Sequence, residues 1–131
     1  MSLADQLNAD PLPLARHLGI EIAEATPGRV VARLTVREEI CTSGGILHGG
    51  AFMALADTAA AIGASLNLPE GANTTTIESK TNFLGSAALG VTVSAEATPV
   101  HIGRRSSVWQ TRITHPSGKL LALVTQTQLV I

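Results

Sequence analysis

The chain has 131 residues, of which 45% are hydrophobic and 15% are charged, and its formal net charge is −1. This length predicts one domain, residues 1–131, with a single core. The Lys and Arg residues are scattered and the aromatic residues are one Trp and two Phe, which excludes the basic stripe and stacking platform of a nucleic-acid-binding protein. Because charged residues are scarce, we expect a homo-oligomer that buries part of this surface.

Cysteine and histidine usage and the N-terminal segment indicate which kinds of site and location to expect. Cys41 is the only cysteine, and the four His residues lie too far apart for a local ligand pair, so we expect no disulfide, no metal and no cofactor. The N-terminal segment lacks a basic start followed by an apolar run, and the most apolar segment is interrupted by Gly49, Gly50 and Asp57. We therefore expect neither a signal peptide nor a membrane span, and a cytoplasmic protein.

The first third of the chain predicts one short helix and a hairpin. Residues 12–18 have helical apolar spacing, with Pro13 near the start and Gly19 just after the end, which is typical of a short helix. Residues 19–36 alternate apolar and polar side chains around a turn at Pro27 and Gly28. This pattern predicts two strands that share one apolar face, formed by Val30, Ala32, Leu34 and Val36. Residues 38–47 are rich in Thr, Ser and Gly and predict a loop.

One long helix and four strands follow. The Ala-rich segment from Gly49 to about Leu66 predicts the helix, which Pro69 and Gly71 terminate. Strand patterns then occupy residues 74–84, 90–102, 105–115 and 119–131. One long helix followed by an antiparallel run predicts an α+β fold in which the sheet wraps around the helix.

Asp57 is the unusual residue of the long helix. A helical wheel separates it from a bulky stripe that would pack on the sheet, and it lies instead on a face of small residues. That face is formed by Gly50, Met53, Ala54, Ala60, Ala61 and Ala64. A carboxylate in apolar surroundings is suited to proton transfer. Alternatively, Asp57 hydrogen-bonds a nearby hydroxyl, or caps a second helix together with Thr58.

The start of this helix offers a second functional group. Gly49 and Gly50 place bare backbone N–H groups at the positive end of the helix dipole, as an oxyanion hole requires. Eight residues separate Gly49 from Asp57, which is about 12 Å along a helix and too far for both to act on one carbonyl. A two-fold dimer with antiparallel helices brings Gly49 of one chain beside Asp57 of the other.

The segment "GGILHGGAFMALADT" resembles the motif of hotdog-fold acyl-CoA thioesterases, in which His-Gly-Gly is followed nine positions on by Asp or Glu. The phenylacetate-pathway (PaaI-type) group is the most similar. "IESKTNFLGSAALG" and "HIGRRSSVWQTRITHPSGKLLALVTQTQ" resemble its later strands. The resemblance implies a hotdog fold and hydrolysis of an acyl-CoA to the free acid and coenzyme A. The resemblance also implies that Asp57 is the general base or nucleophile, and that the Gly49 N–H of the other subunit polarises the thioester carbonyl.

Further site residues follow from the resemblance, with departures. Thr42 stands where relatives carry the Asn or Gln that orients substrate or water, and Ala61 replaces a Thr of a sister group. Thr76, or Thr75 if the alignment slips, falls near a Ser or Thr that holds the nucleophilic water. His48 shapes the loop in such proteins, so we expect a structural role more than a catalytic one.

The sequence leaves two alternatives for the role of a pair of arginines, and two rival functions for the whole protein. Arg104 and Arg105 are either clamps for the coenzyme A phosphates or solvated charges at a strand edge. One rival function is a hotdog protein that binds acyl-CoA without turnover, which Thr42 and Ala61 make plausible. The other is a hydratase or dehydratase, for which His48 is the only histidine beside the helix. The acyl group, aryl or fatty, does not follow from the sequence.

Overall fold

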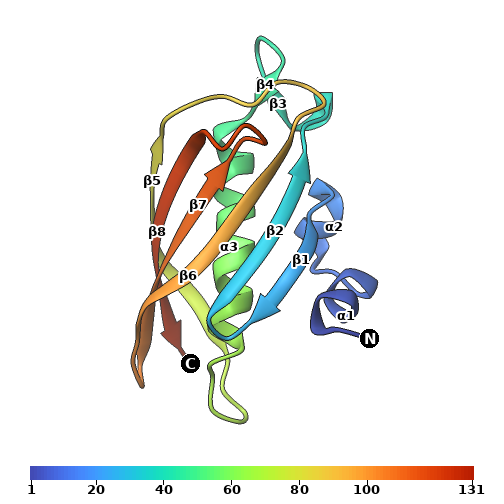
Figure 1. Ribbon diagram of the computed structural model, residues 1–131. Coiled ribbons are helices and arrows are strands. Elements are labelled where there is room, and N and C mark those ends of the chain that lie inside the picture. The colour runs from blue at the N-terminus through green and yellow to red at the C-terminus, as the bar shows by residue number, and fades with distance from the viewer.

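The computed structural model describes all 131 residues and consists of a curved antiparallel sheet around one long helix (Figure 1). The helix is α3, Gly49–Ser65. In spatial order the six strands are β1 Glu21–Thr26, β2 Arg29–Thr35, β6 Thr92–Ile102, β7 Ser106–Thr114, β8 Leu120–Val130 and β5 Thr74–Phe83. The predicted α+β hotdog architecture is confirmed.

Alternating side chains build the core, as expected. The turn at Pro27 and Gly28 joins β1 to β2, which then pairs with β6 from Val30 opposite Ala97 to Thr35 opposite Thr92. The inward residues of these two strands are at most 1% exposed, because successive side chains of a strand point to opposite faces. These residues are Val30, Ala32, Leu34, Val93, Ala95 and Ala97.

Two short helices before β1 and three short elements before α3 complete the fold. The sequence interpretation missed α1, Leu3–Ala9, which precedes the expected α2, Pro13–Leu18. Ser2 and Asp5 form a capping box that starts α1, and this signal is readable in the sequence. The predicted loop at 38–47 contains a 3-10 turn, Glu38–Ile40, and a small hairpin of β3, Cys41–Thr42, and β4, Ile46–Leu47.

The structure of the long helix differs from two expectations. It runs without a break through Asp57, so the alternative in which Asp57 and Thr58 cap a second helix is wrong. Ala60 and Ala64, which we expected on the open face, are 0% and 2% exposed. The sheet therefore covers more of α3 than the wheel predicts, and Gly63 explains why. A Cβ at Gly63 would lie 2.6 Å from the ring of Trp109, so only glycine allows this close packing.

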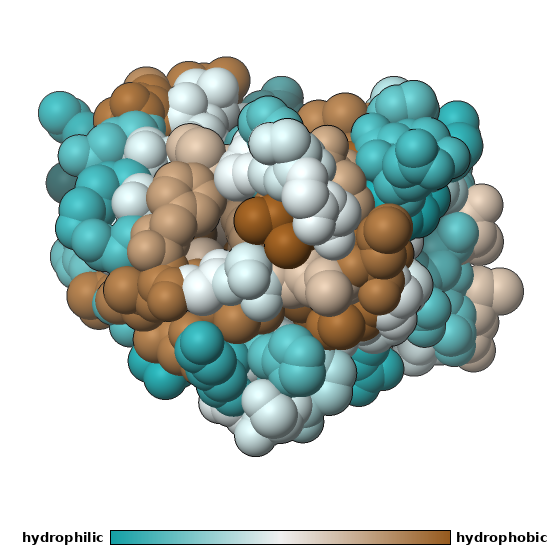
Figure 2. Space-filling view, turned by 90° about the horizontal axis from the view of Figure 1, so that it is seen from above, coloured by the Kyte–Doolittle hydropathy of each residue, from teal (hydrophilic) through white to brown (hydrophobic).

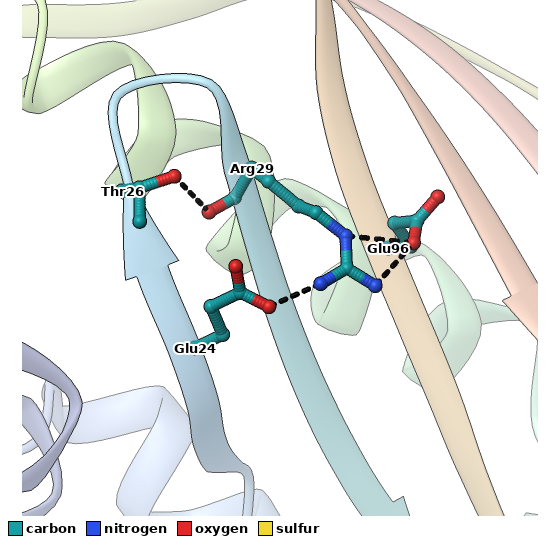
Figure 3. Close-up of polar contacts among 4 residues, drawn as sticks. All are labelled: Glu24, Thr26, Arg29 and Glu96. Atoms are coloured by element: carbon teal, nitrogen blue, oxygen red, sulfur yellow. Dashed lines mark hydrogen bonds and ion pairs between the residues drawn. The ribbon is translucent and has the colours of Figure 1, made fainter.

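The outer face of the sheet is polar. Arg29 of β2 forms ion pairs with Glu24 of β1 and Glu96 of β6, and Thr26 donates a hydrogen bond to the Arg29 carbonyl across the turn (Figure 3). The hydrogen bond to Glu96, helped by the charges of both glutamates, raises the pKa of the Arg29 guanidinium. Three strands are thus tied together on the side away from α3.

None of the helices combines the length and the hydropathy that crossing a membrane requires.

Candidate active site

The first turn of α3 leaves one backbone donor free. His48 is the N-cap, and its Nδ1 accepts a hydrogen bond from the Gly50 N–H at 2.7 Å. The N–H groups of Ala51 and Phe52 donate to the His48 carbonyl. The Gly49 N–H has no partner within the chain. Of the two glycines proposed from the sequence, Gly49 is therefore the one that can donate to a ligand at the positive end of the helix.

The absence of a side chain at Gly49 also matters for packing. A Cβ at Gly49 would lie 3.3 Å from the ring of Phe83, at the end of β5. Phe83 is 53% exposed and packs edge-on against Phe52, with ring centroids 6.3 Å apart. The ring of Phe83 thus packs against the first residue of α3 on the side where a side chain would project.

Asp57 lies in the middle of α3, and two side chains hold one of its oxygens. Thr76 of β5 donates its hydroxyl to Asp57 Oδ1 at 2.6 Å, and Gln126 of β8 donates its amide Nε2 to the same oxygen at 2.9 Å. Asp57 Oδ2 accepts no hydrogen bond within the chain. The open alternative of a hydroxyl contact is therefore observed. It leaves the second oxygen of the half-buried carboxylate free to react.

A second tier of polar side chains supports this contact. Gln128 donates its Nε2 to Thr76 Oγ1 at 2.6 Å, and Thr74 donates its hydroxyl to Gln128 Oε1 at 3.0 Å. Gln126 and Gln128 are 0% and 1% exposed. The sequence interpretation predicted the strand at 119–131 but did not name either glutamine as a site residue. Their positions share the parity of the buried Ala122 in β8, and this parity would have placed them inside.

The structure separates the other predicted site residues. Thr76 contacts Asp57, whereas its neighbour Thr75 is exposed. A bulge after Thr76 changes the register of β5 there. Thr42 is exposed on β3 and its side chain makes no hydrogen bond. Gly49 and Asp57 stay eight residues apart on one continuous helix, about 12 Å, so a single chain does not bring them together.

Arg104 and Arg105 lie in the turn between β6 and β7, at the end of the molecule where α3 finishes (Figure 1). Both are exposed and neither has a carboxylate partner. Arg104 borders an open cavity of about 760 Å³ together with Asn67 and Pro69, which follow α3. The two arginines are therefore remote from the free N–H at the start of the helix.

A mainly apolar cavity of about 310 Å³ opens beside the start of α3. His48 and Gly50 border it. Its apolar lining comes from α2, the 3-10 turn and the first turns of α3, and includes Leu14, Leu18, Ile40, Ala51 and Ala54. Cys41 borders it as well and donates its thiol to the Arg37 carbonyl at 3.3 Å. Figure 2 looks onto this end of the molecule and shows hydrophobic residues gathered near its centre, with hydrophilic ones around them.

Comparison with known proteins identifies relatives of this chain and solved structures with the same fold. The 1,4-dihydroxy-2-naphthoyl-CoA hydrolase of Listeria monocytogenes is 36% identical over 110 residues, which are 84% of this chain and 89% of that protein. A thioesterase of Haemophilus influenzae has a solved structure with a TM-score of 0.91 and 32% identity, covering 100% of this chain and 91% of that one. The PaaI protein of E. coli, from the phenylacetic acid degradation operon, gives a TM-score of 0.88 at 26% identity, with 98% and 91% covered.

The sequence pattern of the thioesterase superfamily matches residues 44–122, more than half of the chain. This range includes the start of α3 with its free N–H, Asp57 and Thr76. The chain therefore belongs to the thioesterase superfamily and is a hotdog-fold thioester hydrolase.

Proposed function

We propose that the protein hydrolyses an aryl- or fatty-acyl-CoA to the free acid and coenzyme A. The observation that carries this proposal is Asp57, whose Oδ1 is held by two donors while Oδ2 is free. The CoA thioester named for the Listeria relative supports a CoA substrate. That relative's naphthoyl group, and the phenylacetic acid operon of the E. coli neighbour, favour an aromatic acyl group.

The chemistry needs a base or nucleophile and an oxyanion donor. As a base, Asp57 Oδ2 takes a proton from water while the water oxygen attacks the thioester carbon. As a nucleophile, Oδ2 attacks that carbon itself, and water then hydrolyses the anhydride. In either case the carbonyl oxygen gains negative charge, which the Gly49 N–H and the helix dipole stabilise. The C–S bond then breaks, and coenzyme A leaves as a thiolate that takes up a proton.

The site is shared between two subunits of a homodimer in this proposal, because Gly49 and Asp57 lie about 12 Å apart on one helix. Two features support a second copy. Strand β5 is at the edge of the sheet with no neighbour on its outer side, and it exposes Ile77 and Phe83 by 57% and 53%. The adjacent face of α3 is only half-buried around Met53, Asp57 and Ala61. The homo-oligomer in this proposal is a dimer or a dimer of dimers. Its proposed location is the cytoplasm.

The remaining candidate residues receive supporting roles. His48 shapes the start of the helix, since its Nδ1 is engaged by the Gly50 N–H. Thr42 lies near that start on β3 and replaces a larger amide, so we propose weaker orientation of the substrate there. Arg104 and Arg105 are free of carboxylate partners and bind coenzyme A phosphates.

The first experiment measures thiol release from a panel of aryl- and fatty-acyl-CoAs by wild type and Asp57→Asn. We expect turnover by wild type and a loss of at least about a hundredfold in kcat for the variant. Near-wild-type turnover by Asp57→Asn would remove Asp57 from the mechanism. Binding of acyl-CoA by the wild type without any thiol release would favour the non-catalytic alternative, which Thr42 and Ala61 keep open.

The second experiment tests the sharing of the site. Gly49→Pro removes the proposed N–H donor, and Gly49→Ala is the matched control because it places the same Cβ against Phe83 but keeps the N–H. Gly49→Pro and Asp57→Asn are unfolded and refolded together. Random pairing gives about half mixed dimers with one intact site in two, so about a quarter of wild-type activity should return. If both variants fold and pair but the mixture stays inactive, the site is not shared in this way.

A further inference from the structure

We propose that Gln126, Gln128 and Thr76 are positioning residues that determine which oxygen of Asp57 reacts, and that the Thr76 hydroxyl serves the carboxylate instead of holding the water. This inference rests on the proposed function of Asp57 as base or nucleophile. None of the three side chains needs to touch the substrate. They act through their contacts with Asp57 and with one another.

The direction of every hydrogen bond in the network is determined. An ionised carboxylate only accepts, so Thr76 must use its one hydroxyl hydrogen on Asp57 Oδ1. The Thr76 oxygen can then only accept, which it does from Gln128 Nε2 at 2.6 Å. This orientation turns Gln128 Oε1 toward Thr74, which donates to it. A hydroxyl with its hydrogen already engaged cannot donate to a water molecule, so a contact of Thr76 with water would have to use the remaining acceptor lone pair of its oxygen.

Gln126 provides the second, independent constraint. Its Nε2 donates to the same Asp57 Oδ1, and this is its only side-chain hydrogen bond. The side chain is 0% exposed, and its Oε1 has no partner. An unpaired polar atom in a core destabilises the fold by about 1–3 kcal/mol. A hydrophobic side chain would avoid that cost, so the feature that distinguishes glutamine here is its donor on Asp57.

Two donors on one oxygen restrict the rotation of the carboxyl group. The terminal torsion of an Asp side chain is otherwise broad. With Oδ1 held by donors from β5 and β8, the direction of Oδ2 is fixed as well. Misplacing a reacting atom by about 1 Å costs on the order of a hundredfold in rate. The network therefore acts on kcat, while the affinity for the substrate depends on other groups.

The test compares variants that keep the shape of each side chain but remove its polar groups. Thr76→Val and Gln126→Met each delete a donor to Asp57, whereas Thr76→Ser keeps the hydroxyl. Thr125→Val is the control, since Thr125 lies on the outer face of the same β8 strand and its side chain makes no hydrogen bond. Circular dichroism and thermal unfolding verify that each variant folds, and thiol release gives kcat and KM separately.

We expect Thr76→Val and Gln126→Met to lower kcat by roughly 10- to 100-fold with KM changed less than about threefold. Thr76→Ser and Thr125→Val should stay within about threefold of wild type. Gln126→Met is the decisive variant because Gln126 contacts Asp57. If the network acted only through a water held by Thr76, the kcat of this variant would be unchanged. If Thr76→Val does not fold, Gln126→Met carries the test alone.

Three results would overturn the inference: an unchanged kcat in Gln126→Met, an effect confined to KM, or an equal loss in Thr76→Ser and Thr76→Val. Each of these outcomes is separate from failure of the proposed function. That function fails if Asp57→Asn keeps its activity, whatever the network variants do.

Discussion

The two sides of α3 differ in what the sheet presents to the helix. On one side β2 and β6 present only aliphatic side chains, which are at most 1% exposed. On the other side β5 and β8 present hydroxyl and amide groups, namely Thr74, Thr76, Ser79, Thr81, Gln126 and Gln128. Both sides pack against the same helix, yet only the second contains groups that can hold a carboxylate. The first side stabilises the fold, and the second positions Asp57.

The two sides of α3 also differ in how their side chains contribute to the stability of the fold. Burying an aliphatic side chain contributes about 1.5–3 kcal/mol, whereas a buried polar atom without a partner destabilises by about 1–3 kcal/mol. Ser79 Oγ, Thr81 Oγ1 and Gln126 Oε1 are such atoms, and all belong to the polar side. Removing such an atom should raise the free energy of unfolding, whereas truncating a buried aliphatic side chain should lower it.

The largest effect is expected on the apolar side. Leu34 of β2 is 1% exposed, so Leu34→Ala should lower the free energy of unfolding by about 3 kcal/mol through lost burial and a cavity. Denaturant unfolding measures the change. Leu89→Ala is the control, because Leu89 is 51% exposed and should change stability by less than about 0.5 kcal/mol. Similar values for the two variants would contradict the conclusion that the buried aliphatic side chains of β2 and β6 stabilise the fold.

A smaller effect of opposite sign is expected where the polar groups continue into β7. Thr111 is 0% exposed and its hydroxyl has no partner. Thr111→Val keeps the shape and removes that hydroxyl, so the free energy of unfolding should rise by up to about 1 kcal/mol. Thermal unfolding of the two proteins under one condition measures it. A clear loss of stability would show that the hydroxyl has a partner in the folded protein in solution.

The smallest effect concerns α1, which packs beside β1 on the apolar side. The side chain of Ser2 and its backbone N–H, which donates to Asp5 Oδ2, lower the pKa of the Asp5 carboxyl in the folded chain. A carboxyl group with a lowered folded pKa contributes stability above its unfolded pKa, and this contribution is lost as the pH falls through the folded value. Acidification below about pH 4 should therefore weaken the start of α1. Hydrogen exchange of the α1 amides should increase there in wild type, and Ser2→Ala should show weaker protection already at neutral pH.

Local patterns predicted most of the fold, and the limits have physical causes. The strand alternation placed Val30, Ala32 and Leu34 inside, and the Ala-rich run predicted α3 to within a residue of its end. The wheel of α3 wrongly placed Ala60 on the open face. It treats the sheet as flat, whereas this sheet curves around the helix.

The candidate site was predicted only in part. The sequence motif named Asp57, Gly49 and His48 as candidates, which belong to one segment, and the resemblance added Thr76. The partners of Asp57 come from β5 and β8, 19 and 69 residues away along the chain. Contacts of that separation depend on strand register, and the bulge after Thr76 shifts the register within β5. The parity of β8 would have placed Gln126 and Gln128 inside, but their contacts with Asp57 and Thr76 could be predicted only once that pairing was known.

Asn8 of α1 has a consequence for how the molecule associates. Its side-chain amide exchanges two hydrogen bonds with the backbone of Ile22 in β1, both 2.8 Å long, much as a neighbouring strand would. β1 is also short and irregular after Ile22, and such features discourage strand addition. The two edges of the sheet are therefore unequal, with β1 blocked and β5 open. Two copies joined through β5, as proposed above, would use up the only receptive edge of each, so growth along the sheet would stop at a closed pair instead of continuing into a fibre.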